Sequence, residues 1–198
     1  MAMDSSENKI GVFGGCFDPV HTGHLIVAEM AREQFRLEKV IFVPAKIPPH
    51  RGRLVASSEH RIEMLKLAIK GNPAFEISDV EISREGVSYT YDTMMIFKEK
   101  FFFTSLYIIV GWDAFVILPS WRNAEKLAQD FLFIVAPRIT EKNQMPRFHF
   151  DVKYIMLDIP RIEISSTLVR QRIKARRSIR YLVPDEVFNY IIRENVYG

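Results

Sequence analysis

The sequence predicts an α/β fold in which a parallel β-sheet is covered by helices. Runs at residues 39–43, 106–110 and 131–135 are almost entirely apolar, which is typical of strands buried on both faces. Segments with helical periodicity separate these runs along the chain. Strands that alternate with helices indicate a parallel sheet, because parallel neighbours need long crossover connections.

A glycine-rich stretch joins the first strand to the first helix. We expect a strand at residues 9–13 and a helix that begins near Thr22, with Gly14, Gly15 and the sequence Cys16-Phe17-Asp18-Pro19 between them. Because glycine has no Cβ, the pair is expected to let the backbone turn sharply and to let a ligand approach the chain. The Asp-Pro dipeptide then favours a turn.

Two histidines stand at the start of this helix. His21 and His24 are three residues apart, and residues at that spacing share one face of a helix. The unpaired N–H groups and the positive dipole end of a helix start favour phosphate. Either histidine alone could be an ordinary surface residue. The ordered pattern of strand, Gly-Gly, Phe-Asp-Pro and His-x-Gly-His, however, indicates a site for a nucleotide polyphosphate.

The segment at residues 44–53 contains three prolines, which exclude regular structure. It also carries the basic or titratable residues Lys46, His50 and Arg51. Two interpretations stay open from this segment alone: a solvated basic loop, or a lid that closes over bound phosphates.

The middle of the chain alternates helix and strand signals. A helix capped at residues 57–58 and ending near residue 70 is expected to bury Ile62, Leu65 and Ile69. Residues 75–82 are expected to be extended, and a helix over residues 91–100 follows Ser88-Tyr89-Thr90. Further elements are a short helix at 123–128, a strand at 152–157, a helix near residue 166 and a last helix after residue 184.

Residues suited to ligand contact follow the strand at 106–110. Gly111 and Asp113 come directly after it, and Trp121 lies in a loop with Pro119 and Ser120. In open parallel sheets, ligands bind outside the carboxyl ends of the strands. The pattern therefore predicts a single-domain, Rossmann-like, doubly wound parallel sheet flanked by helices, with its ligand beside Gly111 and Asp113.

A second phosphate motif follows the last strand, at residues 164–170. Its sequence is Ile164-Ser165-Ser166-Thr167-Leu168-Val169-Arg170. A Ser or Thr hydroxyl can cap the next helix and leave its first amides for an anion. Arg170 lies one turn further on and can offer a charged fork to the same anion. Simple capping is the alternative, but a second such helix start in a chain with His21 and His24 favours phosphate binding.

Composition limits the class of protein. The chain has 198 residues, 48% of them hydrophobic, a formal net charge of +3 and one cysteine, Cys16. We expect one globular domain over residues 9–198 after a loose tail at residues 1–8. The charge suits an acidic ligand and is too small to indicate nucleic acid. The cysteine count, with no apolar signal or spanning segment, indicates a cytoplasmic protein without a membrane partner; a homo-oligomer stays open.

These motifs together resemble a known superfamily. The stretch from Gly14 to His24 is similar to the signature of the nucleotidyltransferases that carry a His-x-Gly-His motif. Within that superfamily the chain resembles the bacterial nicotinate-nucleotide adenylyltransferases along nearly its whole length. The motifs that carry the closer resemblance are Pro48-Pro49-His50, Ser88-Tyr89-Thr90, Gly111 with Asp113, Pro119-Ser120-Trp121, residues 164–170 and Tyr181-Leu182-Val183-Pro184.

The resemblance implies transfer of AMP from ATP to nicotinate mononucleotide, a step of NAD biosynthesis, with Mg²⁺ carried by ATP rather than bound by the protein. His21, His24 and Arg170 would be catalytic, and the loop with Lys46, His50 and Arg51 would be the lid. The mononucleotide would contact Cys16, Phe17, Tyr89, Thr90 and Trp121. ATP would be bound by Phe13, Gly14, Gly15, His21, His24, Gly111, Asp113, Ile164, Ser165, Ser166, Thr167 and Arg170.

The sequence departs from the family pattern at three places: Cys16 replaces a Thr or Ser, Trp112 stands between Gly111 and Asp113, and Arg138-Ile139 replaces Arg-Pro-Gly. The last leaves the role of Arg138 open. Two alternative functions stay open. One is another small-molecule adenylyltransferase such as pantetheine-phosphate adenylyltransferase, which usually has Thr where His21 stands. The other is a non-catalytic nucleotide-binding module, against which the intact His21, His24 and Arg170 argue.

Overall fold

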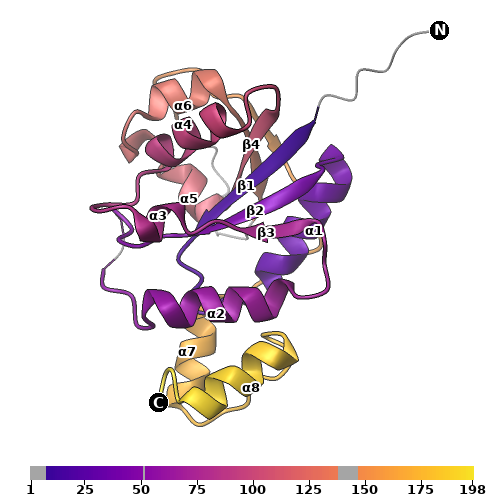
Figure 1. Cartoon of the computed structure of the whole chain (residues 1–198), viewed down its shortest axis with the longest axis vertical. Helices are drawn as coiled ribbons and strands as arrows, with labels where there is room; N and C mark the ends of the chain where they lie inside the picture. The colour runs from indigo at the N-terminus through magenta and orange to yellow at the C-terminus, as the bar shows by residue number, and fades with distance from the viewer. Residues whose placement is uncertain (1–7, 51, 138–146) are drawn as a thin grey trace, which may run out of the picture.

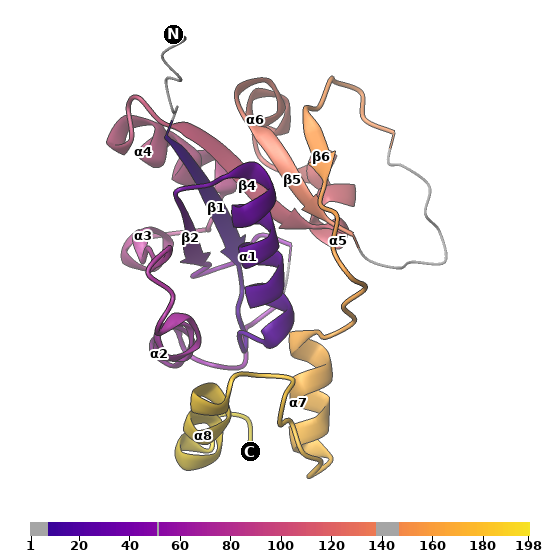
Figure 2. The ribbon, with the colours of Figure 1, turned by 90° about the vertical axis from the view of Figure 1, so that its right-hand side faces the viewer.

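The computed structural model describes residues 8–50, 52–137 and 147–198. These residues form a six-stranded sheet in the order β3-β2-β1-β4-β5-β6, and every pair of neighbouring strands is parallel (Figures 1 and 2). The α/β fold predicted from the sequence is therefore confirmed. The strands are β1 (Lys9–Gly15), β2 (Lys39–Pro44), β3 (Phe75–Ile77), β4 (Ser105–Gly111), β5 (Leu132–Ala136) and β6 (Tyr154–Met156).

Strand β1 lies at the centre of the sheet and decides where a ligand can bind. Gly11 of β1 is level with Val40 of β2 on one side and with Tyr107 of β4 on the other. The chain adds β2 and β3 in one direction, returns, and adds β4 to β6 in the other. Such a reversal opens a crevice at the carboxyl ends of the two strands beside it. The crevice is thus expected between the ends of β1 and β4.

The faces of the sheet pack into two separate cores. Alternate residues of β1 face opposite sides, so Val12 belongs to one hydrophobic cluster and Phe13 to the other. The cluster with Phe13 includes buried residues of α1, α2, α7 and α8, and the cluster with Val12 includes buried residues of α4, α5 and α6. The main helices are α1 (Thr22–Phe35), α2 (Ser58–Ile69), α4 (Thr90–Lys100), α5 (Trp112–Val116), α6 (Ala124–Asp130), α7 (Ser166–Lys174) and α8 (Asp185–Glu194).

Two sequence expectations about these elements were wrong. Residues 80–83 form a short helix, α3 (Val80–Ser83), whereas residues 75–82 were expected to be extended. The reason is that Glu81 turns into the structure, where Thr93 donates to its carboxyl group. In α2, Leu65 is buried as expected and Ile69 packs against the core, but Arg61 and Met64 are buried in place of Ile62.

The glycine pair also differs from expectation. Gly14 and Gly15 are the last residues of β1, and neither has a positive φ. The turn comes later, at Phe17 with φ 47° and at the cis Asp18–Pro19 peptide. A Cβ on Gly15 would lie 2.9 Å from the Phe17 ring, whereas nothing lies within 4 Å of a Cβ built on Gly14. The pair therefore allows close approach of a side chain and of a ligand, and does not make the turn.

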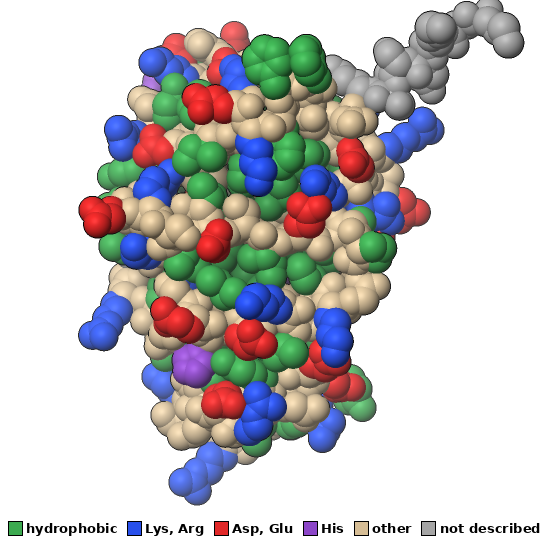
Figure 3. All heavy atoms as spheres, in the orientation of Figure 1, with side chains coloured by type: hydrophobic (Ala, Val, Ile, Leu, Met, Phe, Trp, Pro, Cys, Tyr) green, Lys and Arg blue, Asp and Glu red, His purple; other side chains and the backbone are tan. Residues whose placement is uncertain are grey.

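The surface shows no dominance of one charge sign on the face in Figure 3, where acidic and basic side chains are interspersed. Such mixing agrees with the net charge of +3. Within the described ranges, none of the helices is both long and apolar enough to cross a membrane. The expected tail falls mostly on residues 1–7, which are outside the described ranges, while the carbonyl of Asn8 accepts a hydrogen bond from the Ser105 amide.

Candidate functional site

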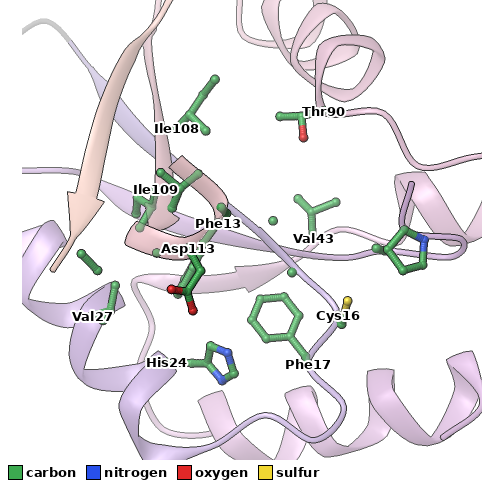
Figure 4. A pocket seen from close by; sticks show the side chains of 18 of the residues that line it. Phe13, Cys16, Phe17, His24, Val27, Val43, Thr90, Ile108, Ile109 and Asp113 are labelled. Atoms are coloured by element: carbon green, nitrogen blue, oxygen red, sulfur yellow. The ribbon is translucent and has the colours of Figure 1, made fainter. Parts of the chain in front are cut away.

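A pocket of about 630 Å³ opens at the carboxyl ends of β1 and β4. His24 lies beside the Phe17 ring near Asp113, and Thr90 lies on the far side of the pocket (Figure 4). The structure thus brings most of the predicted site residues to one cavity. Those that line it are Phe13, Gly14, Gly15, Cys16, Phe17, His21, His24, His50, Tyr89, Thr90, Gly111, Asp113, Trp121, Ile164, Ser165, Ser166 and Thr167.

The two histidines lie at the start of α1, as predicted. Their rings are stacked with centroids 3.6 Å apart. The backbone N–H of His21 donates to Nδ1 of His24 at 3.2 Å. Because Nδ1 accepts, the proton of a neutral His24 ring belongs on Nε2. Phe13 and Phe17 hold the same ring edge to face. The orientation and tautomer of His24 are therefore set by the protein.

The expectation that the first amides of α1 stay free holds only in part. The amide of Thr22 donates to the carbonyl of Leu182 at 2.9 Å. This bond ties the start of α1 to the segment between α7 and α8. The Thr22 hydroxyl also donates to the carbonyl of Tyr181 at 3.2 Å, so part of the motif at residues 181–184 contacts the start of α1.

The turn at residues 16–19 is held by side chains from two helices. Arg61 of α2 donates to the carbonyl of Cys16 at 2.9 Å, and Ser166 of α7 donates to the carbonyl of Pro19 at 2.8 Å. Arg170 of α7 donates to the carbonyl of Asp18 at 2.6 Å. The two phosphate motifs are thus bonded directly to each other, which Figure 2 shows as the adjacent starts of α1 and α7.

Arg170 is the predicted site residue whose position differs most from expectation. Its guanidinium contacts the Asp18 carbonyl and the Thr167 hydroxyl, and it is not among the residues that line the pocket. The reason is that α7 packs directly against the loop, so the long side chain reaches backbone before it reaches the cavity. Ser165 caps α7 as predicted by accepting from the Leu168 amide.

The far end of the pocket is built from the start of α4 and the loop before α6. The indole Nε1 of Trp121 is buried and has no hydrogen-bond partner among the described residues. Arg122 lies over the Tyr89 ring at 4.8 Å and forms an ion pair with Asp92 at 3.4 Å. Arg122 also lines the pocket. Sequence reasoning missed it, because an arginine in a loop carries no local signal of what it faces.

Glu81 is a second residue that sequence reasoning missed at this end. It is buried, it lines the pocket, and its carboxyl group accepts from the Thr93 hydroxyl at 2.6 Å. Burial raises the pKa of Glu81, while hydrogen bonds from Thr93 and Ser88 oppose the rise. The sequence gives only a weak indication of Glu81: it is a single carboxylate between Val80 and Ile82, in a segment that was expected to be extended.

The predicted lid is only partly at the pocket. His50 lines it, together with Pro48 and Pro49. The ammonium of Lys46 instead donates to the carbonyl of Arg84 at 3.0 Å. The amides of Lys46 and Ile47 both donate to the buried Ser88 hydroxyl, at 2.9 and 3.3 Å. Arg51 and Arg138 lie outside the described residues.

No group of three or more His, Cys, Asp or Glu side chains within residues 8–50, 52–137 and 147–198 could hold a metal ion. The polar groups that line the pocket are instead imidazoles, hydroxyls, backbone amides, the Arg122 guanidinium and the carboxyl groups of Glu81 and Asp113, of which Asp113 lies near His24. This set suits a phosphorylated ligand better than a bare cation.

Known proteins resemble this chain both in sequence and in fold. The cytidylyltransferase-like family matches residues 12–172. A probable nicotinate-nucleotide adenylyltransferase of Dictyoglomus thermophilum is 44% identical over 193 residues, which cover 96% of this chain and 99% of that protein. The nicotinate-nucleotide adenylyltransferase of Bacillus subtilis is 41% identical over 96% of this chain and 98% of that protein. The fold is shared with the Plasmodium falciparum nicotinic acid mononucleotide adenylyltransferase complexed with NaAD, at a TM-score of 0.78, 23% identity and coverage of 96% and 97%.

Proposed function

We propose that this chain, which belongs to the cytidylyltransferase-like family and within it to the nicotinate-nucleotide adenylyltransferases, transfers AMP from ATP to nicotinate mononucleotide and releases pyrophosphate. Family membership confirms the resemblance predicted from the sequence motifs. The products are nicotinate adenine dinucleotide and pyrophosphate, a step of NAD biosynthesis. We expect the reaction to take place in the cytoplasm, because a chain with one cysteine can form no disulfide within itself and so fits a reducing compartment.

The observation that carries the proposal is that one pocket joins two chemically different ends. At one end, the starts of α1 and α7 meet at residues 16–19 beside the two histidines. At the other, an indole N–H without a protein partner among the described residues lies near Thr90. A polyphosphate fits the first end and a flat heterocycle fits the second. Both substrates of an adenylyl transfer could therefore bind side by side.

The reaction needs orientation and charge stabilisation more than proton removal. The attacking 5′-phosphate is already ionised at pH 7, so no general base is required. Alignment of the two reactants could supply up to about 7–11 kcal/mol. Each fixed donor to the leaving pyrophosphate could add about 3 kcal/mol. The Nε2–H of His24, whose tautomer the His21 amide sets, is proposed as one such donor.

The remaining roles follow from position. His21 and the backbone at the starts of α1 and α7 would contact the α- and β-phosphates, with Ser165 and Thr167 near the γ-phosphate. Gly111 and Asp113 would lie near the adenosine. Arg170 is proposed to act mainly by holding the loop, because its guanidinium is engaged with Asp18 and Thr167. Mg²⁺ is proposed to arrive with ATP, held by phosphate oxygens and water, because the pocket supplies no carboxylate cluster among the described residues.

We further propose that the acid form of the pyridine is preferred over the amide. A carboxylate only accepts hydrogen bonds, whereas a carboxamide also donates. Arg122 brings a cation to this end, and its ion pair at 3.4 Å offsets the charge of Asp92, the acid nearest to Thr90 in sequence. The Glu81 carboxyl group is buried, and burial raises its pKa, while the Thr93 hydroxyl donates to it at 2.6 Å.

The test is turnover of ATP with a panel of acceptors under the same Mg²⁺ concentration: nicotinate mononucleotide, nicotinamide mononucleotide, phosphopantetheine and riboflavin phosphate. We expect nicotinate mononucleotide to have the highest kcat/KM, by up to roughly 10⁴-fold over the amide. Turnover of phosphopantetheine alone would support the pantetheine alternative, and ATP binding without any turnover would support the non-catalytic one. Equal kcat/KM for acid and amide would contradict the proposed preference.

A further inference from the structure

The Asp18 carboxylate is a buried charge that the proposed chemistry does not use. Only 3% of the residue is exposed. Its Oδ2 accepts from the Val55 amide at 2.8 Å, and its Oδ1 accepts from the Ala56 amide at 3.0 Å and from the Tyr197 hydroxyl at 2.8 Å. A carboxylate that is buried away from water must be satisfied by donors such as these.

Asp18 is also the centre of the turn that carries the phosphate motif. The turn lies directly after Gly15 and directly before His21. Its backbone is fixed by Arg61 at Cys16 and by Arg170 at Asp18. Because the Asp18 side chain is anchored on the loop before α2, movement of this carboxylate would shift the start of α1. The stacked histidines belong to that start.

Tyr197, near the other end of the chain, donates its hydroxyl to the Asp18 carboxylate. It follows α8, is only 5% exposed, and packs its ring in the same core cluster as Phe13 and Phe17. Its hydroxyl is the one side-chain donor among the Asp18 carboxylate contacts given above. Burial and the neighbouring Asp18 charge raise the pKa of Tyr197, so the hydroxyl keeps its proton and remains a donor.

We propose that Tyr197 is a positioning residue: its hydroxyl fixes Asp18 and thereby aligns residues 16–24 with the phosphates. The proposal rests on the proposed function, because alignment has meaning only for a reacting nucleotide. It goes beyond that function by assigning a role in turnover to a residue 179 positions away in sequence from Asp18. No local motif connects the two residues.

Two conservative variants separate this role from simple packing. Tyr197→Phe removes the hydroxyl and keeps the ring in the core. Tyr190→Phe is the matched control, because Tyr190 lies in α8, also packs against the same core cluster, and has its hydroxyl on His60 Nδ1 at 2.9 Å rather than on the turn. Both variants lose one hydroxyl hydrogen bond, so a merely structural role predicts similar effects on activity.

The first readout is independent of activity. Hydrogen exchange of the Val55 and Ala56 amides, which donate to Asp18, is measured in the wild type and both variants. We expect faster exchange at these two amides in Tyr197→Phe and wild-type exchange there in Tyr190→Phe. Unchanged exchange in Tyr197→Phe would overturn the proposal even if the chain had no transferase activity.

The second readout is steady-state kinetics with ATP and nicotinate mononucleotide. A misplacement of about 1 Å can cost on the order of 100-fold in rate, and loss of one of several anchors should cost less, so we expect kcat of Tyr197→Phe to fall by about tenfold. The KM for ATP should change by less than about threefold, because most donors to the phosphates remain. Tyr190→Phe should keep wild-type kcat.

A double variant tests whether Tyr197 acts through Asp18. Asp18→Asn, alone and combined with Tyr197→Phe, completes a cycle in which non-additive effects report coupling. We expect the double variant to be no slower than Asp18→Asn alone. Additive losses, or an unchanged kcat in Tyr197→Phe, would overturn the proposal. Lack of turnover in the wild type would instead refute the proposed function and leave the exchange result to decide the role of Tyr197.

Discussion

The two ends of the pocket are built in different ways. At the proposed phosphate end, side chains from α2 and α7 donate to the backbone carbonyls of Cys16, Asp18 and Pro19. At the proposed pyridine end, Trp121 follows a short 3₁₀ turn, and its indole N–H has no partner among the described residues. Arg122 there is exposed over half of its side chain. Side-chain hydrogen bonds from two helices fix the first end, whereas the start of α4 and a loop form the second.

The difference follows from what each end has to do. Donors that stabilise a developing charge work best when they are already in place, because no reorganisation is then needed at the moment of reaction. Recognition of an acceptor is more often carried by loops on a rigid scaffold. We therefore expect substitutions at the phosphate end to lower kcat and substitutions at the pyridine end to raise the KM for the mononucleotide.

The largest expected effect is at His24. His24→Ala removes the proposed Nε2–H donor, and loss of one such donor typically lowers kcat by about 10²–10³-fold. The KM for ATP should change much less, since the contact strengthens as pyrophosphate charge develops. Steady-state and single-turnover rates on the folded variant check this. His149→Ala, at an exposed histidine outside the pocket, is the control; an unchanged kcat in His24→Ala would refute the role.

Trp121→Phe tests the proposed pyridine end, where we expect an effect on the KM for the mononucleotide rather than on kcat. The variant keeps an aromatic face and loses the buried N–H donor. Loss of one hydrogen bond to the ligand typically costs about 0.5–1.5 kcal/mol, so we expect the KM for nicotinate mononucleotide to rise by up to about tenfold. The KM for ATP and kcat should stay near the wild-type values. A fall in kcat with an unchanged KM would show that the two ends are not separate.

Ser88 joins the pyridine end to the proposed lid, and its loss should have a moderate effect. Ser88→Ala leaves the Lys46 and Ile47 amides without their acceptor. A buried donor left unsatisfied costs about 1–3 kcal/mol of stability, and these two amides are only part-buried, so the loss should lie at the low end of that range. We expect a lower Tm and faster hydrogen exchange at the amides of Lys46 and Ile47. Ser83→Ala, which removes an exposed hydroxyl bonded to Asp79, should change neither. If the loop is a lid, ligand binding should slow exchange of the His50 amide in the wild type, since Pro48 and Pro49 carry no amide hydrogen.

Glu81 gives the smallest expected effect and one with a defined pH dependence. Burial raises the pKa of Glu81 above its ordinary 4.5. Below pH 4.5 the group is protonated in both the folded and the unfolded state. As the pH rises past 4.5, the unfolded state ionises first, so the wild type loses stability until the raised folded pKa is passed.

Glu81→Gln cannot titrate, so its free energy of unfolding relative to the wild type should increase across this pH window and then level off. Denaturant unfolding at a series of pH values measures the difference. Glu85→Gln, at an exposed position, is the control and should show no such trend. A difference that is constant with pH would mean that burial does not raise the pKa of Glu81.

The sequence by itself determined the fold class and the positions of two helix starts, with His21 and Ser165 at their caps; phosphate binding there stays a prediction. Apolar runs such as residues 106–110 report burial through local pattern. The order of Gly14, Gly15, His21 and His24 places two histidines at a helix start regardless of what lies around them. These features depend on neighbours within a few residues, and the structure reproduces them.

Only the tertiary structure decided how each polar group is used. It assigned Arg170 to a backbone carbonyl, brought Arg122 and Glu81 to the pocket, and paired Asp18 with Tyr197. Hydrophobic periodicity states which face of an element is buried, but it carries no information on which distant element covers that face. Hydrogen bonds require atoms about 3 Å apart in a specific orientation. That condition is met only once the sheet order and the helix packing bring residues 18 and 197 together.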